Sequence, residues 1–360
     1  MIICPRERYS QKADQMGAQL TFTKQECASL QLMQNDLRFV YMLARNREKL
    51  HSNYIASSQP YFGMIIDGAE DWINSYNNSH KTGFTVPTFT AEQQVFYEKM
   101  RGLIKLWDTS YEDIYHRLKT AYTESRVYFS SVCAPLAKYM KLYDIFGADI
   151  VDGKYCGNTI LCNLFTPDYI LGSENGERIK RLAAFAGRYV AVFGATKEYL
   201  LNDEMEFHTV DYGGFRKSPV GNEFSDKFVL FSMLCQINYI LKCIDAFIHE
   251  ETTTKLRFAY ILYYYIVGIL PEINAKLSTS FSTDFNWYSR EFRNSMAHYK
   301  LGKVLKESEM VFDDPFYGLT QKFLGTDYNT VKQAVMSALA SLAEQIEEYL
   351  KIEKEVKVYD

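Results

Sequence analysis

Apolar residues recur at helical spacings along most of the chain, and this pattern predicts an almost entirely α-helical protein. The first periodic segment runs from Thr23 to about Tyr54, and a second runs from Ala91 to about Phe129. A polar, turn-rich stretch at Asn74 to Pro87 separates the two. Within the first segment, residues three or four positions apart form the stripe of an amphipathic helix. These residues are Leu30, Met33, Leu37, Val40 and Leu43.

The middle of the chain combines helical segments with stretches rich in glycine, proline and acidic residues. Further helices are predicted at Pro135 to Phe146 and at Glu177 to Leu201. Between them, the glycines of Asp149 to Gly176 predict a loop, with a β-prone piece at Thr159 to Phe165 that could form part of a strand pair. Helical periodicity stops again at Asn202 to Asn222, which is the clearest candidate for a domain boundary.

After this boundary the apolar pattern becomes very regular and predicts an antiparallel helical bundle. The expected elements are helices at Glu223 to Glu250, Thr253 to Leu277, Thr283 to Lys306 and Asn329 to Val356, with a turn at Asp313-Asp314-Pro315. The chain has 360 residues, which exceeds the usual size of one helical domain. We therefore expect an N-terminal helical domain of unknown role at residues 1–205 and a helical bundle domain at residues 206–360. One long irregular domain is the alternative.

Two apolar segments, Phe228 to Ile248 and Phe258 to Leu270, are predicted to be buried helices rather than membrane spans. The first contains interior polar and charged residues, and the second is shorter than the ~20 apolar residues that a bilayer requires. The N-terminus has no apolar run of the length found in signal peptides. The sequence therefore predicts a cytoplasmic protein that has no membrane partner.

Composition narrows the classes of partner and of metal site. Hydrophobic residues make up 47% and charged residues 23%, the balance of an ordinary globular protein. The net charge of −4 argues against a general polyanion binder, so any RNA contact is expected to be local. The seven cysteines are odd in number and lack zinc-binding spacing, which predicts free, buried thiols.

The segment from Thr283 to Lys306 carries the candidate chemistry. On a continuous helix one narrow stripe is apolar and predicted to face the core, and the opposite arc is polar. The apolar stripe contains Phe285, Tyr288, Phe292, Met296 and Tyr299. The polar arc contains Asn286, Arg290, Arg293, Asn294, Ala297 and His298, and basic residues follow at Lys300, Lys303 and Lys306.

These residue types suit the cleavage of RNA. An imidazole titrates near neutral pH and can transfer protons, while guanidinium groups bind phosphate oxygens in a forked geometry. The 2′-hydroxyl of RNA can act as the nucleophile, so the protein must remove its proton, stabilise charge on the phosphorane and protonate the departing 5′-oxygen. One histidine cannot easily supply both proton transfers. An ordinary solvated helix face remains the structural alternative.

The string Arg293-Asn294-Ser295-Met296-Ala297-His298 resembles the motif of HEPN domains, in which an arginine and a polar residue are followed by three residues and a histidine. The resemblance covers about Gly221 to Asp360. HEPN domains are helical modules of bacterial toxins, abortive-infection proteins and CRISPR-associated nucleases. The resemblance implies that two copies of the motif meet, across a dimer or between two domains, to form one metal-independent site. Cleavage there is expected to leave a 2′,3′-cyclic phosphate and a 5′-hydroxyl.

Carried over to this chain, the resemblance implies a role for each motif residue. Arg293 would contact the scissile phosphate, His298 would transfer protons, and Asn294 would orient the histidine or the ribose. Substrate contacts are expected from Arg290, Tyr299, Lys300 and Lys303. No metal or cofactor is predicted. The expected partners are RNA, a second copy of the chain that meets the first through the helix of Arg293 and His298, and an antitoxin or activator protein.

Two alternatives follow from the same residues. Arg45 and His51 also stand at a permitted motif separation, and a second half-site there would let one chain cleave alone. Against this, the intervening Glu48 and Lys49 are typical of a charged helix surface. In the other alternative the chain is a noncatalytic HEPN-fold protein, whose polar arc holds RNA, a nucleotide or a protein partner.

Overall fold

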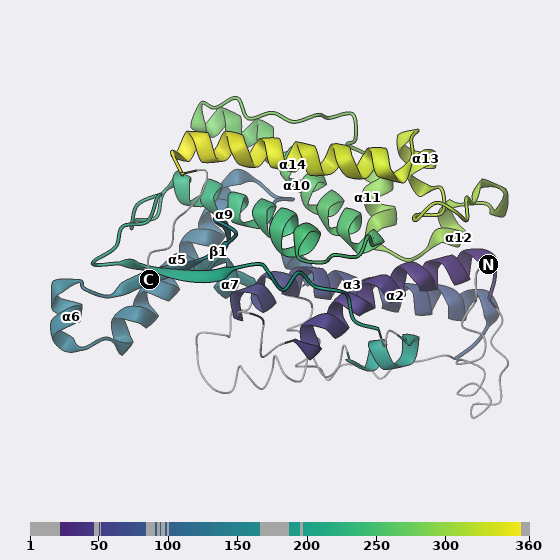
Figure 1. Cartoon of the computed structure of the whole chain (residues 1–360), viewed down its shortest axis with the longest axis horizontal. Coiled ribbons are helices and arrows are strands. Elements are labelled where there is room, and N and C mark those ends of the chain that lie inside the picture. The colour runs from purple at the N-terminus through teal and green to yellow at the C-terminus, as the bar shows by residue number, and fades with distance from the viewer. Residues whose placement is uncertain are drawn as a thin grey trace.

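The computed structural model describes residues 22–46, 50, 52–83, 101–165, 187–194 and 197–353, together with positions 91, 94 and 98. This part of the chain is mostly α-helical and contains one small antiparallel sheet (Figure 1). The prediction of an almost entirely α-helical protein is therefore confirmed for most of this part of the chain, and the sheet departs from it.

Two long helices form the N-terminal part. Helix α2 (Lys24–Arg45) begins at Thr23, whose hydroxyl accepts a hydrogen bond from the backbone N–H of Glu26 while the Glu26 carboxylate accepts one in return. This reciprocal cap fixes the start of the helix. Helix α3 (Ser52–His80) packs against α2 (Figure 1). The chain leaves the helix at Asn46, so the predicted single helix to Tyr54 was wrong.

The predicted boundaries between residues 74 and 146 also change. The polar stretch after Asn74 is helical as far as His80, and residues 84–90 lie outside the described part. The predicted helix from Ala91 to Phe129 is interrupted, because a new helix, α5 (Tyr111–Val132), begins at the Ser110 cap. Helix α6 (Pro135–Met140) is much shorter than predicted and leads directly into a strand.

The sheet has three antiparallel strands in the order β2-β1-β3: β1 (Asp144–Val151), β2 (Lys154–Asn158) and β3 (Phe207–Gly213). Seven of the eight β1 residues are buried, so β1 has the continuous apolar pattern that periodicity cannot distinguish from a buried helix. The β-prone segment after β2 is a helix, α7 (Thr159–Phe165), so its assignment as extended chain was wrong. The strand pair lies just before it.

Strand β3 lies within the predicted boundary segment, just after the division at residues 205 and 206, and it pairs with β1, which lies before that division. One cluster of buried apolar residues extends from Ala28 in α2 to Ile352 near the C-terminus. The two halves of the described chain therefore share a core. The division at residues 205 and 206 stays a prediction.

The long C-terminal helices agree with the sequence pattern. Helix α9 (Asp226–Asn238) continues as the π-helix η2 (Tyr239–Ala246), followed by α10 (Thr253–Leu277) and later by α14 (Tyr328–Leu350). The segments 226–246 and 253–277 are long and apolar enough to cross a membrane, but 78% and 83% of their most apolar windows are buried inside the molecule. Burial of both segments was predicted.

The predicted helix from Thr283 to Lys306 is divided into two short helices. Helix α11 (Arg290–Ala297) begins at Ser289, whose hydroxyl accepts a backbone hydrogen bond, and α12 (Leu301–Val304) follows after an interruption. Because the chain is not helical before Ser289, Phe285 and Tyr288 are 53% and 41% exposed instead of facing the core. The core positions predicted for Phe292, Met296 and Tyr299 are confirmed, since all three are buried.

The segment between α12 and α14 contains a 3-10 turn, η3 (Glu307–Glu309), and the short helix α13 (Leu319–Leu324). Between these two elements the Asp314 carboxylate accepts hydrogen bonds from the backbone N–H groups of Phe316 and Gly318. The turn predicted at Asp313-Asp314-Pro315 is therefore confirmed.

A buried ion pair ties α2 and α10 to the end of α11. Arg257 of α10 pairs with Asp36 of α2, and these two residues are 3% and 1% exposed. The Tyr299 hydroxyl donates to Asp36 at 2.7 Å, and so does the Thr254 hydroxyl. Arg257 also donates to the carbonyl of Ala297 at 3.2 Å. We call these five residues the Arg257–Asp36 network.

Removing the charge of Asp36 should destabilise the protein strongly, because a buried guanidinium would lose its carboxylate. We expect Asp36→Asn to lower the free energy of unfolding by about 3–5 kcal/mol in urea titrations followed by circular dichroism. The exposed pair Lys276–Glu112 provides the matched control, and Glu112→Gln should change stability little. Equal effects of the two substitutions would contradict a structural role for the buried pair.

Candidate functional site

The histidine of the predicted motif follows the last residue of α11 and caps the helix in an extended conformation. The residues before and after it, Ala297 and Tyr299, form hydrogen bonds within the Arg257–Asp36 network. Arg257 donates to the carbonyl of Ala297, and the Tyr299 hydroxyl donates to Asp36. The Arg257–Asp36 network therefore fixes the backbone on both sides of His298, and the imidazole leaves the chain from a well-defined position.

Helix α3 approaches His298 closely because residue 68 is a glycine. A Cβ atom on Gly68 would lie 2.8 Å from the Tyr299 ring and 3.2 Å from the carbonyl oxygen of Ala297, so any other residue would require a shift. Asp67 and Asp71 lie one helical turn apart on this part of α3, and both reach the neighbourhood of His298. The absence of a side chain at position 68 thus places two carboxylates beside the imidazole.

The closest of these contacts joins the imidazole to Asp71. His298 Nδ1 lies 2.5 Å from Asp71 Oδ2, an ion-pair distance without the alignment of a hydrogen bond, and the His298 side chain is 36% exposed. Lys300 Nζ lies 3.1 Å from the same Asp71 oxygen, and Arg101 Nη1 lies 2.6 Å from Asp67 Oδ1. Neither aspartate was predicted from the sequence. The available signal was their spacing of one turn within a largely apolar stretch.

Burial lowers the pKa of His298 below its ordinary value, and the charges of Asp71 and Asp67 oppose part of this effect. Lys300 and Arg257 add to the lowering, because they repel a positive imidazolium. The ring is therefore predominantly neutral at neutral pH. With Asp71 beside Nδ1, the favoured tautomer carries its proton on Nδ1 and leaves Nε2 as the basic atom.

His298 opens onto a surface pocket of about 310 Å³, which we call the His298 pocket. It is lined by Glu291, Asn294, Ser295, His298, Lys300, Leu301, Lys303, Val304 and Phe323. Four of the predicted site residues, Asn294, His298, Lys300 and Lys303, are thus brought together. Arg290 is exposed and, like Arg293, does not line this pocket.

Arg293 is half-buried against the aromatic side of α10. Its guanidinium carbon lies 5.1 Å from the ring centroid of Tyr264 and 5.4 Å from that of Tyr265. Its Nε is buried and has no hydrogen-bond partner among the described residues. Cation–π contacts of this kind hold the guanidinium in place. In a single chain, the arginine and the histidine of the motif do not share the His298 pocket.

A second groove of about 360 Å³ adjoins the first, since Lys300 and Lys303 line both. His80, the last residue of α3, lies in this groove with its Nε2 2.8 Å from Glu26 Oε1, so its predicted place in a polar loop was wrong. Tyr299 contributes only to the floor of the groove, because it is 2% exposed and its hydroxyl is bound in the network. A direct substrate contact by Tyr299 is therefore not supported.

Asp67, Asp71 and His298 form the group with metal-ligand spacing in the described part of the chain. One ligand atom from each lies within 4.8 Å of the others. Each carboxylate already has a cationic partner, because Arg101 contacts Asp67 and Lys300 contacts Asp71. This local charge balance opposes the binding of a further cation, and the geometry favours Asp71 as the partner that orients His298.

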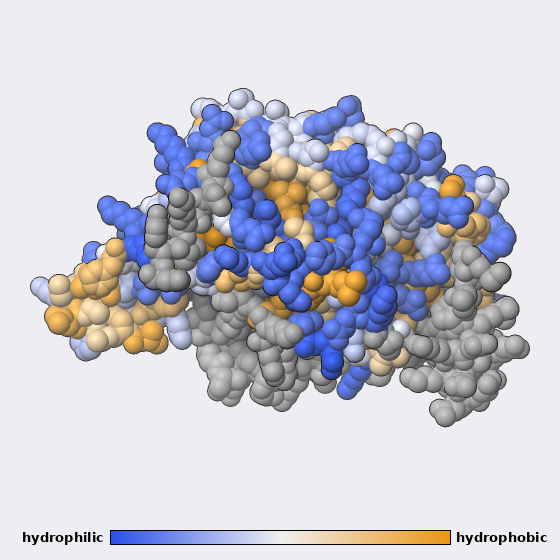
Figure 2. Space-filling view, viewed as in Figure 1, coloured by the Kyte–Doolittle hydropathy of each residue, from blue (hydrophilic) through white to orange (hydrophobic). Residues whose placement is uncertain are grey.

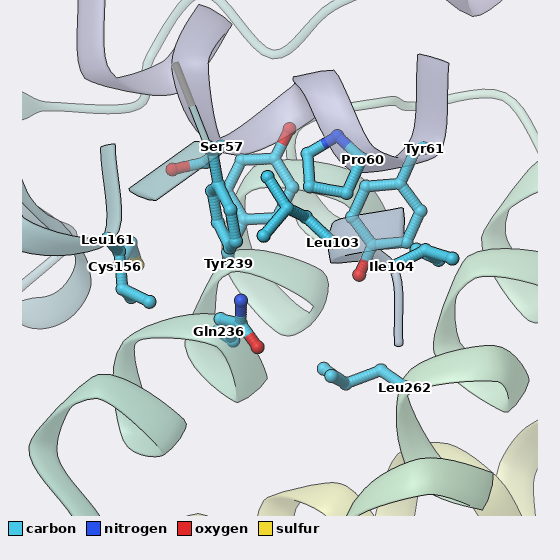
Figure 3. Close-up of a pocket in the computed structure, with 11 residues that line it drawn as sticks. Ser57, Pro60, Tyr61, Leu103, Ile104, Cys156, Leu161, Gln236, Tyr239 and Leu262 are labelled. Carbon is cyan, nitrogen blue, oxygen red and sulfur yellow. The ribbon is translucent and has the colours of Figure 1, made fainter. Parts of the chain in front are cut away.

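The hollow that described residues of α3, α7, α9 and α10 line in the interior is far smaller than the two grooves. The hollow drawn in Figure 3 has a volume of about 20 Å³, which is room for a single water molecule. Leu103, Ile104 and Leu262 lie around it, with the Gln236 amide as one of its polar neighbours. Substrate-sized space near the motif is therefore found at the surface, in the two adjoining grooves.

The thiols and the second candidate motif have no part in these grooves. The prediction of free thiols is confirmed for the cysteines that the structure describes, and four of these are buried: Cys156, Cys162, Cys235 and Cys243. Arg45 forms an exposed ion pair with Glu198 at 2.9 Å, as expected of a charged helix surface. His51 lies outside the described residues, so a half-site there stays a prediction.

Comparisons with protein-family models, with curated proteins and with solved structures found no match to this chain. The HEPN interpretation therefore depends on the resemblance of the motif and on the geometry around it.

The effect of the Asp71 carboxylate on the pKa of His298 should be measurable. Asp71→Asn removes a carboxylate that stabilises the imidazolium, so we expect the pKa of His298 to fall further in NMR titrations of the ring protons. The ring-proton signal that is missing in the His298→Gln variant is the signal of His298. Glu70→Gln is the matched control on the same helix, because Glu70 bonds to Tyr189 instead, and it should leave the titration unchanged. An unchanged or raised pKa in Asp71→Asn would contradict the proposed pairing.

Proposed function

We propose that the protein is a metal-independent endoribonuclease of the HEPN type that acts in bacterial antiphage defence or as a toxin. The observation that carries this proposal is the placement of His298. Its Nδ1 contacts Asp71, its backbone is held on both sides, and it opens onto a pocket that also contains Asn294, Lys300 and Lys303. The biological role follows from the family resemblance alone.

This geometry suits the first half of the reaction. The neutral imidazole would accept the proton of the ribose 2′-hydroxyl at Nε2, and Asp71 would stabilise the imidazolium that forms. The 2′-oxygen then attacks the adjacent phosphorus, and the bond from phosphorus to the 5′-oxygen breaks. Lys300 and Lys303 would neutralise phosphate charge, while the amide of Asn294 would orient the ribose. The products are a 2′,3′-cyclic phosphate and a 5′-hydroxyl.

The second half of the reaction requires an acid for the departing 5′-oxygen. We propose that His298 of a second copy of the chain, in its protonated imidazolium form, supplies this proton in a composite dimeric site. The position of Arg293 supports this arrangement, because the arginine does not line the pocket of its own chain. Its half-buried guanidinium would contact the scissile phosphate once two copies of α11 approach each other.

The presence of the adjoining groove favours a polynucleotide, and not a small ligand, as the substrate. Lys300 and Lys303 form the boundary between the two hollows, so a chain of phosphates could pass over them from one to the other. This cationic surface is local, as the net charge of −4 requires. The same features would also suit a noncatalytic protein that only holds RNA, which is the alternative that an experiment must separate.

Single substitutions should distinguish cleavage from binding. We expect His298→Ala to lower the rate of RNA cleavage by about 100-fold or more, because a proton-transfer group is lost, while RNA binding is retained. Arg293→Ala should lower it strongly as well, and Asp71→Asn should cause a smaller loss. The measurement is cleavage of labelled RNA in the presence of EDTA, with end analysis for the cyclic phosphate.

The matched control for this experiment is His116→Ala, which removes an exposed imidazole from α5. This variant should cleave RNA at the wild-type rate. RNA binding without cleavage by the intact protein, tested with its candidate activators, would support the noncatalytic alternative. Cleavage that EDTA abolishes would contradict the metal-independent mechanism.

A shared site also predicts how mixed dimers behave. If each site needs both copies of His298, equal amounts of wild-type and His298→Ala chains that exchange freely should retain about a quarter of the activity, since only wild-type pairs are competent. Independent sites would retain about half. Activity that follows simple dilution after full subunit exchange would therefore contradict the composite site.

A further inference from the structure

One end of the molecule carries apolar side chains that the rest of the structure does not cover. The last turns of α5 and the whole of α6 project there (Figure 1), and no residue of α6 is buried. Val132 is 64% exposed, Leu136 69%, Tyr139 87% and Met140 54%. Figure 2 shows a hydrophobic area at the α6 end of the face in view. Large side chains exposed together in this way mark an interaction surface.

The turn after β3 adds another apolar side chain to the same end. The backbone N–H of Gly214 donates to the carbonyl of Tyr143 at 3.2 Å, and a Cβ on Gly214 would lie 2.6 Å from the carbonyl oxygen of Lys141. The turn is therefore packed against the chain that leaves α6. Phe215, the next residue, is 87% exposed. We call this surface the apolar tip: Val132, Leu136, Tyr139, Met140 and Phe215.

The charged residues inside the two segments that form the apolar tip are all basic. Segments 126–143 and 213–221 contain no aspartate or glutamate, in a chain whose net charge is −4. Lys138, Lys141, Arg216 and Lys217 are exposed and lack an ion pair with any residue that the structure describes, whereas Arg126 pairs with Glu223. Exposed acidic residues lie just outside the two segments, at Glu124, Asp144, Asp211 and Glu223, and Arg216 is close enough to oppose the rise in the pKa of Asp211.

We propose that the apolar tip binds the surface of an anionic lipid bilayer. Leu136, Tyr139 and Phe215 would enter the interface between headgroups and acyl chains, and the four surrounding cations would contact the anionic headgroups. This proposal departs from the sequence-based prediction that the protein has no membrane partner. It concerns peripheral binding only, since the two long apolar helices are buried in the core.

The composition of the tip distinguishes a bilayer from the other candidate occupants. RNA would be bound through cations and flat rings, but Val132, Leu136 and Met140 are aliphatic and offer nothing to a phosphate backbone. A second copy of the chain would place the same four cations opposite one another across a two-fold axis, where they would repel. An anionic bilayer complements both the apolar groups and the cations.

Binding of the full chain to vesicles tests the proposal directly. The probes are vesicles of phosphatidylcholine alone and of phosphatidylcholine with phosphatidylserine, separated by sedimentation at low and at physiological salt. We expect binding to the anionic vesicles only, weakened by salt. Leu136→Ser with Tyr139→Ser, and separately Lys138→Glu with Lys141→Glu, should each lower the partition coefficient by about tenfold or more.

Two matched controls test whether binding to vesicles depends on the position of the substituted residue or only on its type. Leu200→Ser removes an apolar side chain that is 66% exposed outside the tip, and Lys303→Glu reverses a charge in the His298 pocket. Both should bind vesicles like the wild type. Because α6 buries no residue, the tip variants should fold normally, as thermal melting would verify, and should still cleave RNA in solution.

Several results would overturn the proposal. These are absence of wild-type binding to the anionic vesicles, equal binding by the tip variants, or tip substitutions that instead abolish RNA binding or dimer formation. The two vesicle results do not involve the chemistry at His298, so failure of the membrane proposal by these results leaves the proposed ribonuclease untouched. Loss of RNA cleavage in His298→Ala likewise says nothing about binding of the tip to vesicles.

Discussion

The buried pair of Arg257 and Asp36 is the interaction on which the candidate site depends. It joins α2 and α10, and its hydrogen bonds reach the chain on both sides of His298. Burying two charges contributes little net stability by itself, because the cost of desolvation offsets much of their attraction. The stronger consequence is geometric. A guanidinium with several donors can hold a helix end and a carboxylate at once, which an apolar pair of similar size could not do.

The elements that the sequence predicted well are the long C-terminal helices. Helix α10 matches its predicted range, and α14 and the continuous segment of α9 and η2 nearly do, because long apolar runs bounded by polar residues favour buried helices. Strand β1 could not be recognised, since a central strand covered on both faces lacks the alternation that identifies exposed strands. The long helix α3 was missed because its polar C-terminal part resembles a turn-rich loop.

In the candidate site, residues close together in the sequence were predicted, whereas a residue brought in by packing was not. Asn294, His298, Lys300 and Lys303 were predicted from their spacing along one segment, and they line one pocket. Asp71 was not predicted, because it lies far away in sequence and is brought close only by the packing of α3 at Gly68. Tyr299 was correctly placed on the core side, yet also expected to contact substrate. The hydroxyl of a buried tyrosine needs a partner inside the protein, and here Asp36 is that partner.

The positions of the two surfaces also constrain how they could work together. The apolar tip lies at the α6 end of the long axis, whereas α12, beside the His298 pocket, lies toward the opposite end (Figure 1). A bilayer bound at the tip would therefore leave the pocket open to solvent and accessible to RNA. It would also leave the outer face of α11 free to meet a second copy. Membrane attachment by this end is thus compatible with a shared nuclease site, whereas attachment through α11 would cover it.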